Sequence, residues 1–126
     1  MDCNVRHIGE VTILDLKGRL SLGEALAFGP GSDIVLTETI RDLMKAGHKK
    51  VLLNLAGITY ADSSGLGQLA GALATGRTRG LELKLLSPVK QVRDLLRVTH
   101  LESVFNIQDD EAAAIASFST GTAVGA

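Results

Sequence analysis

The stretch ITYADSSGLG, residues 58–67, joins an apolar run to a helical pattern, and the fold follows from these two neighbours. The preceding run, Val51–Leu55, is nearly apolar on both faces, as is typical of an interior parallel strand. After the stretch, apolar residues from Leu66 to Ala74 recur at helical spacing, and Gly80 marks the end of that helix. The sequence therefore predicts a strand, a turn and an amphipathic helix in that order.

Four other segments have the composition of strands. In Val11–Lys17, the residues Thr12, Leu14 and Leu16 share one face, and in Leu81–Leu85 leucines alternate with charged residues. Both patterns predict strands with one buried face. Val5–Ile8 is expected to pair antiparallel with the first of these through a turn at Gly9–Glu10. Residues 104–107 predict a short last strand.

Helical spacing returns between these strands. Leu36–Met44 predicts a helix with Ser32 or Asp33 as its N-cap. Ser87–Pro88 places a favoured N-cap residue before a proline at the first helical position. Asp109–Glu111 puts negative charge at the start of a last helix. The residues expected to face inward from these three helices are Leu36, Ile40, Leu43, Met44, Val92, Leu95, Leu96, Ile115 and Phe118.

Strands that alternate with helices predict βαβ units, and therefore an α/β fold with a mixed, mostly parallel sheet of four to five strands. About four helices are expected, mainly on one face, because Glu82 and Lys84 would point the other way into solvent. The length of 126 residues predicts a single domain over 1–126. We expect its core to span about 5–118, with 119–126 as a flexible tail and Ser21–Gly31 as a long glycine-rich loop.

The composition argues against several classes of function. Thirteen basic and fourteen acidic residues give a net charge of -1, without the electrostatic footprint of direct nucleic-acid binding. The single cysteine, Cys3, cannot form an internal disulfide, which is typical of a reducing compartment. No apolar run approaches the ~18 residues of a membrane helix, and the first residues do not resemble a signal peptide. We therefore expect a cytoplasmic protein without membrane contact.

The glycines and serines of residues 58–67 match two enzyme motifs poorly. Gly65–Ala70 fits G-x-G-x-x-A, but nine residues separate it from Leu55 and no acid ends the next strand. Close helix packing is the better interpretation of these glycines. Ser63 and Ser64 lack the G-x-S-x-G spacing of a nucleophile elbow. No two ligand-type residues have the spacing of a metal site, so we predict no metal. Because the two enzyme motifs also fail, we predict no catalytic residue and no cofactor.

Ser63 is then either a helix cap or a site of modification. Ser and Asp are favoured N-cap residues, so a cap alone is a complete structural explanation. However, one serine is enough for a cap, whereas here two hydroxyls and Asp62 crowd the turn. A phosphate on Ser63 would lie near the positive end of the helix dipole and add about -1.5 to -2 charges beside Asp62. A partner surface that fits the neutral hydroxyl would be repelled, which suits a switch.

The block Asp62–Gly67, with the strand before it and the helix after it, resembles the STAS family of bacterial anti-sigma factor antagonists. The resemblance extends to Gly18–Leu20, Gly80–Leu85 and Ser87–Val89, and it covers about residues 5–118. It implies a binding module, not an enzyme, that docks onto an anti-sigma factor with serine kinase activity and so frees a sigma factor. We expect such a module to be a monomer or a weak homodimer.

The resemblance also implies a phosphorylation cycle. The kinase would use ATP to phosphorylate Ser63 and release the antagonist, and a metal-dependent phosphatase of the PP2C type would restore it. The chain departs from the family at Ser21, where many relatives carry an acid, and in the length of the following loop. These departures leave open a phosphorylation-independent STAS scaffold or signalling-complex subunit. The partner-binding residues implied are Ser21, Asp62, Ser63, Ser64, Gly65, Leu66 and Gly67. Asp62 would orient the Ser63 hydroxyl or help groups of the partner to position it.

Overall fold

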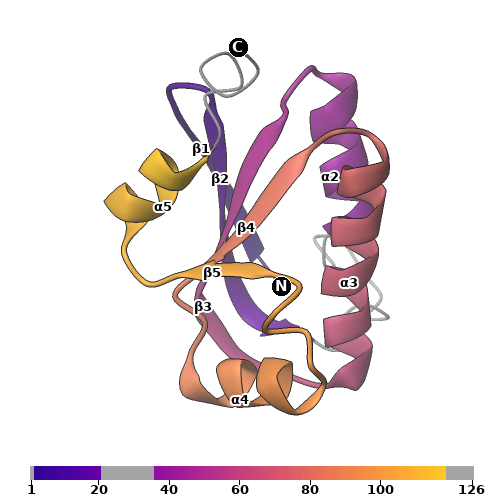
Figure 1. Ribbon diagram of the computed structural model, residues 1–126, viewed down its shortest axis with the longest axis vertical. Coiled ribbons are helices and arrows are strands. Elements are labelled where there is room, and N and C mark those ends of the chain that lie inside the picture. The colour runs from indigo at the N-terminus through magenta and orange to yellow at the C-terminus, as the bar shows by residue number, and fades with distance from the viewer. Residues whose placement is uncertain (1, 21–35, 119–126) are drawn as a thin grey trace.

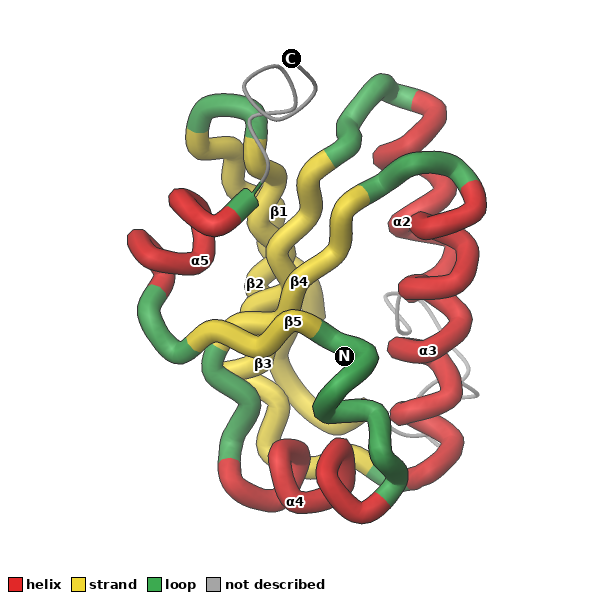
Figure 2. The backbone as a smooth tube through the Cα atoms, in the orientation of Figure 1, coloured by secondary structure: helices red, strands yellow, loops and turns green. Residues whose placement is uncertain are grey.

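A five-stranded sheet carries helices on both of its faces (Figures 1 and 2). The computed structural model describes residues 2–20 and 36–118. The strand order follows the chain, β1 is antiparallel to β2, and all other neighbours are parallel. The α/β fold with a mixed, mostly parallel sheet is therefore confirmed. The described elements are β1 (Asp2–Ile8), β2 (Val11–Leu20), α2 (Leu36–Lys45), β3 (Lys50–Ala61), α3 (Ser63–Thr78), β4 (Glu82–Leu86), α4 (Lys90–Val98), β5 (Asn106–Gln108) and α5 (Glu111–Ser117).

The larger core lies between the sheet and helices α2, α3 and α4. Leu14, Leu53 and Leu85 lie opposite one another on three neighbouring strands, and all three are fully buried. Ile40 of α2 and Leu69 of α3 belong to the same buried cluster. Because burying one such side chain contributes about 1.5–3 kcal/mol, this layer supplies much of the stability that holds α3 on the sheet.

Helix α5 covers the opposite face, so the expectation that this face is open to solvent was wrong. Ile13 and Leu52 point to this side and form a second, smaller cluster with Ala114 and Phe118 of the α5 segment. Figure 1 shows α5 on the side of the sheet away from α2 and α3. Three of the four helices within residues 2–20 and 36–118 still share one face, as predicted.

Lys84, which was predicted to point into solvent, is only 7% exposed. Its Nζ donates to the Ser117 carbonyl at 2.7 Å and contacts the Ser117 Oγ at 2.9 Å. It also lies 4.9 Å from the centre of the Phe118 ring. A cation is favourable at the carboxyl end of a helix, where carbonyl groups lack partners, and this explains the burial of a lysine beneath α5. Glu82 is partly exposed, 3.7 Å from the Lys84 Nζ.

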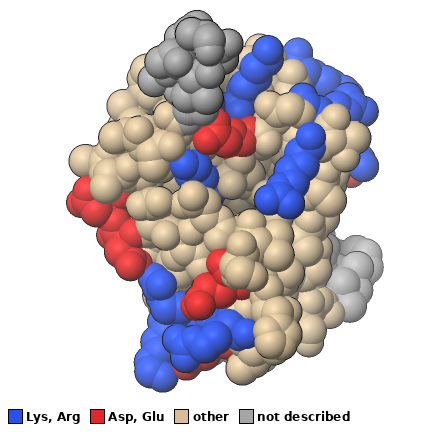
Figure 3. Space-filling view, in the orientation of Figure 1, with Lys and Arg blue, Asp and Glu red and all other residues tan. Residues whose placement is uncertain are grey.

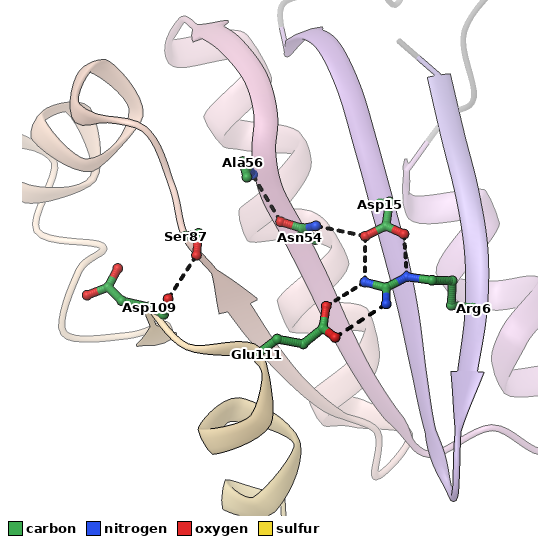
Figure 4. A network of polar contacts seen from close by, with 7 residues as sticks. All are labelled: Arg6, Asp15, Asn54, Ala56, Ser87, Asp109 and Glu111. Carbon is green, nitrogen blue, oxygen red and sulfur yellow. Dashed lines mark hydrogen bonds and ion pairs between the residues drawn. The ribbon is translucent and has the colours of Figure 1, made fainter.

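Arg6 ties the other end of α5 to the sheet (Figure 4). Its guanidinium donates to Asp15 on β2 at 2.6 Å and to Glu111, the first residue of α5, at 2.5 Å. Asn54 on β3 donates to the same Asp15 carboxylate at 2.7 Å. The hydrogen bond from Arg6, assisted by the one from Asn54, lowers the pKa of Asp15 despite its partial burial.

Helices α2, α3 and α4 are each followed, two residues past their last helical residue, by a residue with positive φ. Gly47 has φ 94° and Gly80 has φ 78°, so Gly80 ends its helix as predicted. After α4 the same position is taken by His100, with φ 63°. The N–H of Leu101 donates back to the Leu96 carbonyl at 2.9 Å, which is the hydrogen bond of a Schellman motif.

The start of α4 differs from the prediction. Its N-cap is Val89, which makes no side-chain cap hydrogen bond, and the helix begins at Lys90. Ser87 instead has φ 50° and donates its hydroxyl to the Asp109 carbonyl at 3.2 Å, so it belongs to the connection after β4. Other predictions lie outside the described residues: the caps Ser32 and Asp33, the loop Ser21–Gly31 and the tail 119–126.

Candidate functional site

The candidate site is the Ser63 turn, residues 62–67, which begins where β3 ends. β3 is longer than the predicted Val51–Leu55 and continues to Ala61. In two places β3 carries one more residue than β2, between Asn54 and Gly57 and again between Ile58 and Tyr60. Such bulges bend a strand and increase its twist. Figure 1 shows β3 leading along the bottom of the sheet to the lower end of α3.

Asp62 is the residue that caps α3. Its backbone is extended, and its Oδ1 accepts a hydrogen bond from the Gly65 N–H at 2.8 Å. Its carbonyl accepts from the Leu66 N–H at 2.9 Å, and its own N–H donates to the Leu20 carbonyl at 3.2 Å. Asp62 therefore fixes the start of α3 against β2 and satisfies an N–H group that would otherwise lack a partner.

Ser63 and Ser64 are the first two residues of α3, and both are exposed. Neither hydroxyl forms a hydrogen bond with the described residues, because Asp62 already supplies the cap. The Ser63 hydroxyl thus lies at the positive end of the helix dipole. An anion placed on it would be stabilised by the nearby N–H groups of the first turn.

The other residues of the turn divide into buried and accessible ones. A Cβ on Gly65 would lie 1.7 Å from the Leu20 carbonyl oxygen, so only glycine lets α3 approach β2 this closely. Leu66 is 2% exposed and belongs to the larger core. Gly65 and Leu66, both predicted to bind a partner, therefore offer almost no surface here. Gly67 is exposed, with nothing within 4 Å of its Cβ direction. Ser21 lies outside the described residues.

Two exposed residues beside the turn were not found from the sequence. Arg19 and Tyr60 are register partners at the ends of β2 and β3, and the Arg19 guanidinium lies 4.7 Å from the centre of the Tyr60 ring. Arg and Tyr are enriched among the residues that dominate protein interfaces. The only signal in the sequence was that Arg19 follows Gly18 and that Tyr60 comes shortly before Asp62. Because of its bulges, this part of β3 does not show the alternation of a strand, so the pairing of Arg19 with Tyr60 could not be predicted.

The charges on α4, which packs beneath the end of β3, are largely balanced. Lys90 and Arg97 both contact Asp94, at 2.9 Å and 3.6 Å, and Arg93 contacts Asp109. Figure 3 shows basic side chains gathered at the bottom of the molecule, where Figure 1 places α4, beside acidic ones. This surface therefore carries both signs of charge.

The enzymatic alternatives gain no support from the geometry. His7 and His48 stack at 5.1 Å and share the Thr12 hydroxyl at the start of β2, whereas Ser63 follows the end of β3. In residues 2–20 and 36–118 no three His, Cys, Asp or Glu side chains gather as metal ligands. One premise against a dinucleotide site was wrong, because β3 runs on almost to Gly65. The close approach of Gly65 to Leu20 nevertheless accounts for that glycine by packing.

The architecture and the turn together define an α/β protein in which a helix begins shortly after the central strand of a mixed sheet. Its first residue is an exposed serine whose hydroxyl makes no hydrogen bond with the described residues. The chain belongs to the STAS domain family, whose model matches residues 2–114. None of the helices described is long and apolar enough to cross a membrane.

Solved structures share this fold. TM1081 of Thermotoga maritima is 23% identical, with a TM-score of 0.76 over 90% of this chain and 92% of that one. An anti-sigma factor antagonist from Mycobacterium paratuberculosis is 17% identical, with a TM-score of 0.72 over 92% of each chain. The phosphorylated form of the Bacillus cell fate determinant SpoIIAA is 17% identical, with a TM-score of 0.65 over 93% of this chain and 100% of that one.

Proposed function

We propose that this protein is an anti-sigma factor antagonist that binds an anti-sigma factor with serine kinase activity and is switched off by phosphorylation of Ser63. The observation that carries the proposal is the state of the Ser63 hydroxyl: exposed, without a hydrogen bond to the described residues, and at the start of α3. Asp62 makes the cap, so Ser63 is available for chemistry without loss of the helix start.

The switch follows from the charge that phosphorylation adds. The kinase transfers the γ-phosphoryl group of ATP to the Ser63 oxygen, and ADP and the hydroxyl proton leave. The phosphoserine carries about -1.5 to -2 charges at neutral pH. The first turn of α3 tolerates this charge within the free protein, whereas a partner surface built for a neutral hydroxyl is repelled. A metal-dependent phosphatase of the PP2C type would hydrolyse the ester and restore binding.

The accessible residues of the turn would form the contact surface around Ser63. Ser64 and Gly67 are exposed beside it, and the small size of Gly67 leaves the approach open. Asp62 holds the serine in place through its cap hydrogen bond. The proposal also draws on the neighbours named above, of which one is an anti-sigma factor antagonist and another has a phosphorylated form.

The test begins with the partner. The tagged full chain is used to capture proteins from a lysate of its native cell, in parallel with the Ser63→Asp variant. The proposal expects a serine kinase among the proteins held by the wild type and a loss of at least tenfold with the variant. The captured kinase is then incubated with ATP and with wild type, Ser63→Ala or Ser64→Ala, and phosphate is located by mass spectrometry.

Phosphate on Ser63 in the wild type and in Ser64→Ala, but not in Ser63→Ala, would support the proposal. Phosphate found only elsewhere would overturn it. Partner capture that is the same for wild type and Ser63→Asp, with no phosphoprotein in cells, would favour the phosphorylation-independent scaffold instead.

A further inference from the structure

One side-chain amide holds the strand end from which the Ser63 turn starts. Gln91, in the first turn of α4, accepts a hydrogen bond from the Ala61 N–H through its Oε1 at 2.8 Å. Its Nε2 donates to the carbonyl of the same Ala61, also at 2.8 Å. Ala61 is the last residue of β3, and the cap residue Asp62 follows it directly. Both backbone groups of Ala61 are therefore held by α4.

The neighbouring strand is too short to do this. β4 ends at Leu86, opposite Asn54, so β3 continues to Ala61 without a pairing partner on that side among the described strands. Ala61 is only 1% exposed, and a buried N–H or carbonyl without a partner is costly. The Gln91 amide offers one acceptor and one donor, as a strand backbone would.

We infer that Gln91 is a positioning residue for the Ser63 turn, an inference whose functional part rests on the proposed function. Gln91 fixes Ala61 from the side of α4, while Leu20 fixes Asp62 from the side of β2. The start of α3 is thus held from two directions. Because phosphoryl transfer requires the attacking oxygen in line with the phosphate, and a displacement of about 1 Å costs roughly 100-fold in rate, losing this hold slows phosphorylation.

The structural part is tested by residue-resolved amide hydrogen exchange on the full chain, measured by NMR. Gln91→Leu removes both hydrogen bonds. Lys90→Leu is the matched control, since Lys90 neighbours Gln91 but, within residues 2–20 and 36–118, forms its ion pair with Asp94 of its own helix. The expected result is exchange at Ala61, and at Gly65 and Leu66 in the turn, that is at least tenfold faster in Gln91→Leu, with core amides of β3 unchanged. Unchanged exchange at these sites, or an equal increase at every amide, would overturn the inference.

The chemistry of the contact gives a second signature. Gln91→Glu keeps an acceptor for the Ala61 N–H, but the ionised carboxylate cannot donate to the Ala61 carbonyl. Below a pH of about 4 the side chain is protonated and regains one donor and one acceptor. Protection at Ala61 should therefore recover in Gln91→Glu, relative to wild type, as the pH falls from about 7 to about 4, but not in Gln91→Leu. Equal protection in the two variants across this range would contradict the two-bond geometry.

The functional part uses the kinase captured by the wild-type chain. We expect Gln91→Leu to lower the initial rate of Ser63 phosphorylation at least tenfold and Lys90→Leu to change it less than twofold. A wild-type rate in a variant with disturbed exchange would refute the positioning role, and a slower rate without disturbed exchange would assign Gln91 to direct partner contact instead. If no kinase modifies wild-type Ser63, the proposed function fails, while the exchange data still decide whether Gln91 holds the turn.

Discussion

At Gly65 a single absent methyl group decides how closely α3 approaches the sheet. A Cβ there would lie 1.7 Å from the Leu20 carbonyl oxygen, which is backbone and cannot rotate away. Gly67, two residues later in the same helix, has open space around it. From the sequence the two glycines look alike, since both lie in a helical pattern. Only the packed structure shows that close packing requires glycine at 65 but not at 67.

We predict opposite effects of alanine at these two positions. Gly65→Ala should lower the free energy of unfolding by about 3 kcal/mol, because α3 must move away from β2. Gly67→Ala should raise it by roughly 0.5–1 kcal/mol, because alanine loses less conformational freedom in a helix than glycine does. Urea denaturation of the two variants and the wild type measures both changes. Similar changes in the two variants would contradict the close approach at Gly65.

The roles of the acid and the serines in the turn show what residue types alone can decide. The block predicted a helix start, and α3 begins at Ser63 as that pattern requires. Residue types left open which side chain makes the cap, since Asp and Ser serve equally well. The hydrogen bond from Gly65 to Asp62 answers this, because it depends on the backbone angles at the end of β3.

Among the elements, β3 was the hardest to delimit from sequence. Its first half has consecutive apolar residues, and this half was predicted. From its end at Leu55 onward the buried residues are Leu55, Ile58 and Ala61, which lie three apart instead of two because of the bulges. A strand with this spacing matches neither the period of a strand nor that of a helix, and so the segment looked like a loop.

The end of α4 carries a local strain that sequence alone did not reveal. His100 has φ 63°, in the left-handed region that favours glycine, at the position taken by Gly47 and Gly80 after α2 and α3. We predict that His100→Gly raises the free energy of unfolding by about 1 kcal/mol, because a residue with a Cβ pays roughly that in this conformation. Thermal unfolding measures the change, and His100→Ala is the control that keeps the Cβ. A lower stability in His100→Gly than in His100→Ala would refute the account.

The attachment of α5 depends on pH through Asp15. Arg6 lowers the pKa of Asp15 in the folded protein below the value of about 3.9 in the unfolded chain. The stabilisation is therefore complete above that value and is lost as the pH falls through the lower, folded pKa. We predict that Arg6→Met lowers the free energy of unfolding by about 1–2 kcal/mol at pH 7 and by progressively less below pH 4.

Denaturant unfolding between about pH 2 and pH 7 tests this, with Lys45→Met as the control. That substitution removes the same charge from an exposed position on α2, and Lys45 forms no ion pair with the described residues. If the difference in unfolding free energy between Arg6→Met and wild type is the same over the whole pH range, the ionised Asp15 carboxylate does not stabilise the fold through Arg6.

For the whole molecule, the sequence predicted the parts governed by local pattern and missed those governed by distant contacts. Alternation of strands and helices was enough for the α/β sheet and for the face that carries α2, α3 and α4. The opposite face was misjudged because Lys84 looks solvent-facing until Ser117, far along the chain, supplies its partner. The hydrogen bonds between the Gln91 amide and the Ala61 backbone were not predicted for the same reason, because these two residues lie thirty positions apart and meet only in the folded protein.

A negative charge at Ser63 should act on stability and on partner binding in opposite directions. Ser63→Asp places a negative charge at the start of α3, where it should raise the free energy of unfolding by about 0.3–1 kcal/mol at low salt while weakening capture of the kinase. The control is Thr78→Asp at the other end of the same helix, where the charge meets the negative end of the dipole. It should lower stability and leave capture unchanged. Denaturant unfolding and calorimetry with the captured kinase measure the two quantities. If Ser63→Asp loses both stability and binding, its effect on binding is a consequence of unfolding, and the electrostatic switch at Ser63 is wrong.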